Sequence, residues 1–245
     1  MTTEKQQVHN LIILDESGSM ESIKTTIISG FNELVQSIKG IQVQFPEQEH
    51  FISIVSFNSF GNKILNFMDS VSKLNTIDSS SYSPNATTPL FDAMGFSLTK
   101  LKNELQSKAN FNVLVTILTD GEENASKEYS GTAIKKLIDE LSEENWTFTY
   151  IGTDHDVEKM AANLSIKNTM SFDKNTVGIT NMFDEEFKGR VRYSENLRSG
   201  INTKVNYFDE SNESINAKVD KNENQPLISK LWERVTGKKI NKKNK

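Results

Sequence analysis

The feature that most constrains the fold of this chain is an apolar run that stops abruptly at an acidic residue. Residues 11–14 read LIIL, and Asp15 follows them directly in the segment HNLIILDESGSM. Consecutive apolar residues bounded by a polar turn are typical of a strand that is buried on both faces of a sheet. Such strands belong to parallel sheets covered by helices, so this segment predicts an α/β fold.

The chain up to residue 172 alternates strand-like runs with longer helical stripes. Residues 51–57 and 63–67 flank the turn NSFGN, and their close spacing predicts an antiparallel hairpin at one edge of the sheet. Further strands are expected at 111–118, 146–151 and 168–172. The fold class predicted is therefore α/β: a doubly wound, mostly parallel sheet with one antiparallel edge strand and helices on both faces.

A change in composition after this core divides the chain into parts. We expect an N-terminal extension at 1–7, a domain at 8–200 (a core at 8–172 plus a C-terminal helix), a flexible linker at 201–226, and a short amphipathic helix with a basic tail at 227–245. Leu231 and Trp232 lie on the apolar stripe of the last segment. They need a surface to bury against, either on their own domain or in a partner's groove, so they are candidate partner-binding residues.

Composition excludes several classes of protein. With no cysteine, the chain forms neither a disulfide framework nor a thiolate metal site. A net charge of −5 argues against a protein that coats nucleic acid. The polar start lacks the apolar core of a secretory signal, and no apolar stretch approaches the roughly 18 residues of a membrane span. A soluble, cytoplasmic protein is expected.

Oxygen-bearing side chains recur where the expected strands end. Asp15, Ser17 and Ser19 follow the first strand, and Asp120 follows the strand at 111–118. Thr88 stands where a polar loop meets the start of a helix. Because the ends of parallel strands meet at one edge of a sheet, we expect these five residues to converge there. Their donors are all oxygen, which suits a hard divalent cation such as Mg²⁺.

The order D-x-S-x-S, then Thr before Pro-Leu, then Thr-Asp-Gly after a strand, resembles the von Willebrand factor A domain family with its metal ion-dependent adhesion site. The resemblance covers roughly residues 8–172. The metal-site residues that it implies are Asp15, Ser17, Ser19, Thr88 and Asp120. In such sites the hydroxyls bind the metal directly, the carboxylates act mainly through water, and a partner protein supplies the last ligand from an Asp or Glu.

The resemblance thus implies a non-enzymatic adaptor or adhesion module with Mg²⁺, or alternatively Mn²⁺ or Ca²⁺, as its cofactor. Family members of this kind act in assemblies, some beside AAA-type ATPases or in bacterial stress-response systems. No nucleic-acid partner is expected.

Other interpretations remain open at this point. Ser19 and Thr88 are also suited to capping helices, and Asp120-Gly121 to an ordinary turn. A Mg²⁺-dependent phosphohydrolase of the haloacid dehalogenase type needs a second acid two residues after the first, and that position is Ser17. A scaffold with a structural metal site, binding through the stripe of Leu231 and Trp232, is the remaining alternative.

Overall fold

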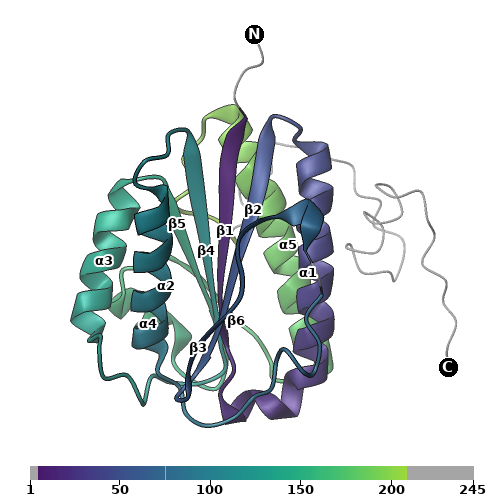
Figure 1. Ribbon diagram of the computed structural model, residues 1–245. Coiled ribbons are helices and arrows are strands. Elements are labelled where there is room, and N and C mark those ends of the chain that lie inside the picture. Colours follow the sequence, from purple (N-terminus) through teal and green to yellow (C-terminus); the bar gives the residue numbers. More distant parts are fainter. Residues whose placement is uncertain (1–4, 75, 209–245) are drawn as a thin grey trace, which may run out of the picture.

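A computed structural model describes residues 5–74 and 76–208, which form a six-stranded sheet between two layers of helices (Figure 1). The strands, in chain order, are β1 (Gln6–Asp15), β2 (Gln48–Asn58), β3 (Gly61–Ser70), β4 (Phe111–Thr119), β5 (Trp146–Gly152) and β6 (Asn168–Ser171). The α-helices are α1 (Lys24–Gln44), α2 (Leu90–Leu105), α3 (Gly131–Glu143), α4 (Val157–Asn163) and α5 (Thr176–Ser199). Two short 3-10 helices, η1 (Gly18–Ile23) and η2 (Val71–Lys73), complete the order.

The strand order is β3-β2-β1-β4-β5-β6, and only the β2–β3 pair is antiparallel. This confirms the predicted α/β class, the mostly parallel sheet and the antiparallel edge strand. The turn at Ser59 and Phe60 is too short for a crossover helix, which is why β3 returns antiparallel beside β2.

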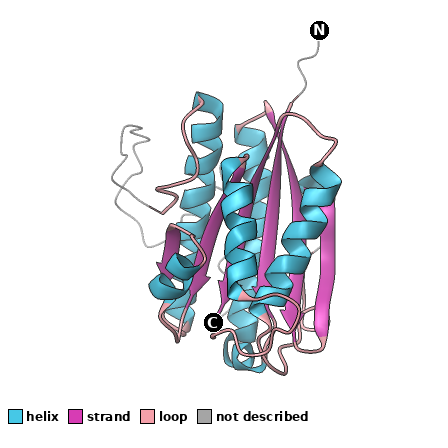
Figure 2. Ribbon diagram, turned by 90° about the vertical axis from the view of Figure 1, so that its left-hand side faces the viewer, coloured by secondary structure: helices cyan, strands magenta, loops and turns pink. Residues whose placement is uncertain are grey.

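The apolar run of β1 packs on both faces of the sheet because successive side chains of a strand point in opposite directions. Leu11 and Ile13 join the core beneath α2, α3 and α4, whereas Ile12 and Leu14 join the core beneath α1 and α5. All four are 2% exposed or less. Figure 2, turned by 90° from Figure 1, shows helices lying over the strands of the sheet.

The expected helix after the core forms as α5, which packs along α1. The polar loop before Thr88 differs from expectation, because it also contributes apolar side chains to the core. Ile77 and Tyr82 are buried in it, and both pack in the core beneath α1 and α5. No helix among residues 5–74 and 76–208 is long and apolar enough to cross a membrane. Leu231, Trp232 and most of the expected linker lie outside the described residues.

Candidate metal centre

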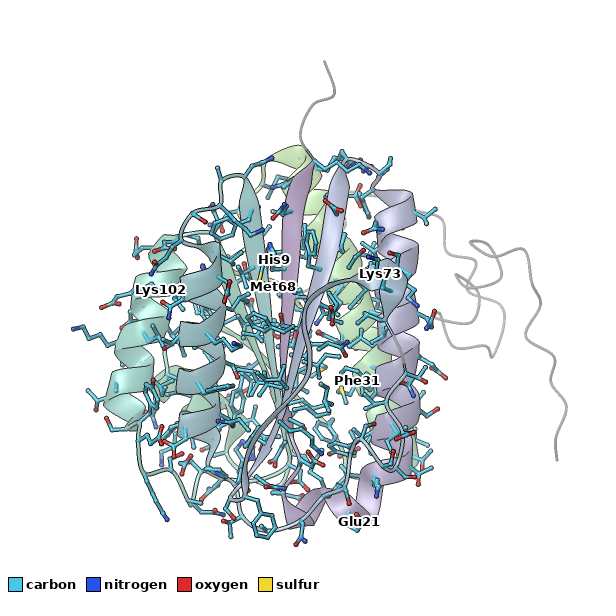
Figure 3. All side chains as sticks on the ribbon, in the orientation of Figure 1. His9, Glu21, Phe31, Met68, Lys73 and Lys102 are labelled. Atoms are coloured by element: carbon cyan, nitrogen blue, oxygen red, sulfur yellow. The ribbon has the colours of Figure 1, made fainter. Side chains whose placement is uncertain are left out.

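The candidate site lies at the carboxyl ends of β1 and β4, the lower edge of the sheet in Figure 1. Strands β2 and β3 extend the sheet on one side of β1, and β4 to β6 extend it on the other. Open α/β sheets bind ligands at such a switch point, because the loops leaving the two central strands diverge there. Figure 3 shows Glu21, which belongs to η1 directly after β1, at this edge.

Asp15 is the last residue of β1 and is completely buried. The register pairs Leu14 with Leu118, which brings Asp15 beside Thr119 at the end of β4. The Thr119 hydroxyl donates to Asp15 Oδ2 at 2.6 Å, and the Ser17 amide donates to Oδ1 at 2.7 Å. Burial raises the pKa of Asp15 to about 6, although both hydrogen bonds act to lower it. The hydrogen bonds therefore fix the carboxyl group in position, but they do not fully offset the cost of burying its negative charge.

Ser17, Ser19 and Asp120 form a chain of oxygen atoms across the two strand ends. Ser17 Oγ lies 3.1 Å from Ser19 Oγ, and the Ser19 hydroxyl donates to Asp120 Oδ1 at 2.6 Å. Ser17 and Asp120 are each about 1% exposed. Residues 101 positions apart in the sequence thus meet directly, as the strand ends lead one to expect.

Thr88 reaches the same place from the loop before α2. Its amide donates to Asn124 Oδ1 at 3.0 Å, and its carbonyl accepts from the Asn124 amide at 3.1 Å. A Cβ placed on Gly121 would lie 3.8 Å from Thr88 Oγ1 and 3.9 Å from Ser19 Oγ. Both hydroxyls therefore face the same short stretch of backbone after Asp120, and Thr88 is itself buried.

The capping interpretations do not describe these residues. The N-cap of α2 is Pro89, whose side chain has no hydrogen-bonding atom, and Thr88 lies one residue earlier. Ser19 lies within η1, several residues before α1 begins, and its hydroxyl donates to Asp120. The turn at Asp120 also differs from an ordinary one, because the carboxylate is buried and paired across strands.

The sequence did not single out Lys174, which follows β6 and lies directly against the site. Lys174 Nζ is 2.7 Å from Asp120 Oδ2 and 3.1 Å from Asp154 Oδ2. Burial acts to lower the pKa of Lys174, but the contacts that its ammonium makes with the two carboxylates raise it overall, so the ammonium keeps its charge. The one feature of the sequence that could have pointed to Lys174 is its position directly after an expected strand, at the same edge of the sheet as the acidic residues.

Two further residues missed in the sequence hold the loop after β1 in place. The buried Tyr82 hydroxyl donates to the carbonyl oxygen of Asp15 at 2.7 Å. Glu16, also buried, accepts hydrogen bonds from the Ser56 hydroxyl, the Lys63 ammonium and the Ser83 amide. Their signals were weak, because a tyrosine in a polar loop and an acid beside a turn are both common.

The donor set suits a hard cation. The converging atoms are two carboxylates and three hydroxyls, all oxygen, as Mg²⁺ and Mn²⁺ favour. Within the described part of the chain, no three His, Asp or Glu side chains are grouped so that they hold a metal by themselves. A metal at this edge would therefore depend on the hydroxyls of Ser17, Ser19 and Thr88.

Comparison with known proteins finds a family whose model matches most of the chain. The model of the von Willebrand factor type A domain matches residues 11–185. No curated protein matches the chain by sequence. Among solved structures, the chain is similar to the vWF domain of the type V pili tip protein Mfa5 from Porphyromonas gingivalis, with 11% identity and a TM-score of 0.54; the match covers 81% of this chain and 97% of that one.

Two other solved structures are similar over most of this chain. The pilus adhesin SpaC from Lactobacillus rhamnosus GG has 12% identity and a TM-score of 0.53, and the match covers 78% of this chain but 30% of the adhesin. The manganese-loaded TRAP protein of Plasmodium vivax has 19% identity and a TM-score of 0.48, with 73% of each chain covered. At these identities the likeness concerns the fold alone.

Proposed function

This chain belongs to the von Willebrand factor type A domain family, and we propose that it is a protein-binding module whose partner is held through a bound divalent cation. Domains of this family commonly mediate protein–protein interaction, are mostly non-enzymatic, and often bind a divalent metal. The observation that carries the proposal is the contact between the Ser19 hydroxyl and Asp120, which joins the two halves of the donor set.

In the proposed site, the hydroxyls of Ser17, Ser19 and Thr88 bind the cation directly. Asp15 and Asp120 orient these hydroxyls or act through water, as residues around a metal commonly do. Hydroxyl ligands carry little negative charge, so the bound cation keeps a strong attraction for an anionic ligand. We propose that a partner's Asp or Glu carboxylate provides that ligand, and that the cation is Mg²⁺, with Mn²⁺ and Ca²⁺ as alternatives.

Loops at the same edge of the sheet are suited to choosing the partner. Phe60, at the tip of the β2–β3 hairpin, is 79% exposed. The neighbouring Ser59 amide donates to the Thr87 carbonyl at 3.0 Å, which joins this tip to the loop that carries Thr88. A hollow of about 350 Å³ lies between the hairpin tip and this loop, and its lining includes Glu16, Phe60 and Lys63. A partner's neighbouring side chains would fit here, because loops on a rigid scaffold usually carry specificity.

The two alternatives have less support. A phosphohydrolase would need an acid where Ser17 stands, and the Ser17 hydroxyl lies against Ser19 instead. A scaffold that binds through Leu231 and Trp232 would capture its partner without metal. Association with an AAA-type ATPase or a stress-response assembly stays a prediction from the family resemblance.

The test has two steps. Calorimetric titration with Mg²⁺, Mn²⁺ and Ca²⁺ first compares the wild type with the double variant Ser17→Ala/Ser19→Ala. Ser22→Ala is the matched control, because Ser22 is exposed on the same segment. We expect one cation per chain for the wild type and control, and none for the double variant.

Capture of partners from the native lysate then uses the same three proteins, with Mg²⁺ or with EDTA. We expect a partner that is retained only with Mg²⁺, only by the wild type and Ser22→Ala, and that is released by added glutamate. Retention of the same partner by all samples would overturn the metal-bridged mechanism.

A further inference from the structure

The side chain of Lys174, which follows β6, reaches the acids that follow β5 and β4. Lys174 belongs to the connection between β6 and α5, Asp154 to the turn after β5, and Asp120 to the turn after β4. The ammonium lies between the two carboxylates, 2.7 Å from Asp120 and 3.1 Å from Asp154. This line of charges runs along the edge from the rim of the sheet to the donor set.

The two acids at either end of this line differ in their surroundings. The Asp154 side chain is 55% exposed, so water stabilises its charge. The Asp120 side chain is fully buried and has two visible partners, the Ser19 hydroxyl on Oδ1 and Lys174 on Oδ2. A buried carboxylate needs a compensating positive charge, and in this structure Lys174 is the cation that supplies it.

A divalent cation bound by Ser17, Ser19 and Thr88 would need the same carboxylate. Two cations at one buried carboxylate repel each other strongly, because little water lies between them to screen the charges. The exposed Asp154 offers Lys174 another partner at a distance that it already reaches. Lys174 can therefore leave Asp120 without losing all compensation of its own charge.

We propose that Lys174 is a tethered competitor for the divalent cation: its ammonium neutralises Asp120 when the metal site is empty, lowers metal affinity, and moves toward Asp154 when metal binds. This inference rests on the proposed function, because it concerns how the same site takes up its metal. It makes Lys174 a residue that sets the metal concentration at which the module becomes competent to bind its partner.

The test is calorimetric titration of Mn²⁺ into the wild type, Lys174→Gln, Lys174→Arg and Lys102→Gln. Lys102 lies twelve residues beyond Leu90 on α2, about 18 Å along the helix from the site edge, so its replacement changes the net charge equally but remotely (Figure 3). We expect the Kd of Lys174→Gln to fall about tenfold, equivalent to about 1.4 kcal/mol, whereas the other two variants stay near the wild type.

The outcomes separate the two proposals. Equal Kd values for the wild type and Lys174→Gln, with metal bound by both, would overturn the role of Lys174 and leave the metal site standing. Binding by Lys174→Gln alone would support both. Absence of binding in every variant, with all of them folded by circular dichroism, would overturn the proposed function and this inference with it.

A second measurement follows the movement itself. Amine acetylation of the wild type, read by mass spectrometry at Lys174 and Lys102, is compared with and without Mg²⁺. The Lys174 side chain is only 22% exposed beside the two acids. We expect metal to speed acetylation of Lys174 and to leave Lys102 unchanged. Equal rates at Lys174 with Mg²⁺ bound would overturn the displacement.

Discussion

At the scale of single residues, Tyr82 supports the backbone that carries the candidate site. Its buried hydroxyl donates to the carbonyl oxygen of Asp15. Tyr82→Phe removes this bond and should lower the free energy of unfolding by about 1–2 kcal/mol, because a buried acceptor loses its donor. Urea denaturation measures the change, and Tyr129→Phe on a half-buried tyrosine is the control. If both variants lost the same free energy of unfolding, the hydrogen bond from Tyr82 to Asp15 would not contribute the stability predicted for it.

His50 should make the stability depend on pH. It is buried beside Arg190, and burial first, then that positive charge, lowers its pKa to about 3. In the unfolded chain His50 takes up a proton near pH 6.5, whereas in the folded protein it stays neutral until the pH is much lower. The free energy of unfolding therefore falls as the pH falls below 6.5. Each pH unit below about 6 costs up to about 1.4 kcal/mol from this group.

Comparison with a variant isolates this contribution. Buried His9, with its pKa lowered to about 4, acts in the same direction, whereas Asp15, raised to about 6, acts in the opposite one. Both are unchanged in His50→Gln. Urea denaturation at pH 7.5, 6.0 and 5.0 measures the free energy of unfolding. Between pH 7.5 and 5.0 this free energy should decrease less for His50→Gln than for the wild type. The same decrease in both proteins would contradict the claim that His50 is buried in its neutral form.

At the scale of elements, α1 and α5 approach closely where α1 has a glycine. A Cβ on Gly30 would lie 2.1 Å from Cδ2 of Phe183, a residue of the core on that face. Gly30→Ala should therefore lower the free energy of unfolding by about 1–3 kcal/mol, even though alanine favours a helix by about 1 kcal/mol. The exposed neighbour Ser29→Ala is the control. Thermal unfolding checks the sign, and a more stable Gly30→Ala would contradict this packing.

The elements themselves were largely predictable, because burial on both faces imposes apolar runs such as 11–14. The convergence of Asp15, Ser17, Ser19 and Asp120 was predictable as well, since parallel strands end at one edge, and the structure brings them together. That they hold a metal stays a prediction. Lys174 and Tyr82 were not foreseen, because no periodicity tells which lysine or which loop tyrosine contacts residues at the strand ends.

At the scale of the whole molecule, folding should not require the metal, but metal binding should stabilise the folded state. The apolar cores on the two faces of the sheet consist of side chains of the protein itself, at positions other than the candidate metal ligands, so the protein should fold in EDTA. A cation that binds only the folded state at 100 times its Kd adds about 2.7 kcal/mol of stability. Thermal unfolding should therefore show a higher Tm with Mg²⁺ for the wild type, and the same Tm with Mg²⁺ or EDTA for Asp120→Asn. Equal Mg²⁺ shifts in both proteins would place the bound metal elsewhere.

The central claim is that one divalent cation binds where β1 and β4 end. The most direct measurement is a crystal structure of the wild type soaked in Mn²⁺, with the metal located by its anomalous scattering. We predict one strong peak within about 2.0–2.3 Å of the hydroxyl oxygens of Ser17 and Ser19, close to Thr88, with Lys174 turned toward Asp154. A well-ordered site without such a peak, or a peak only at other residues, would contradict it.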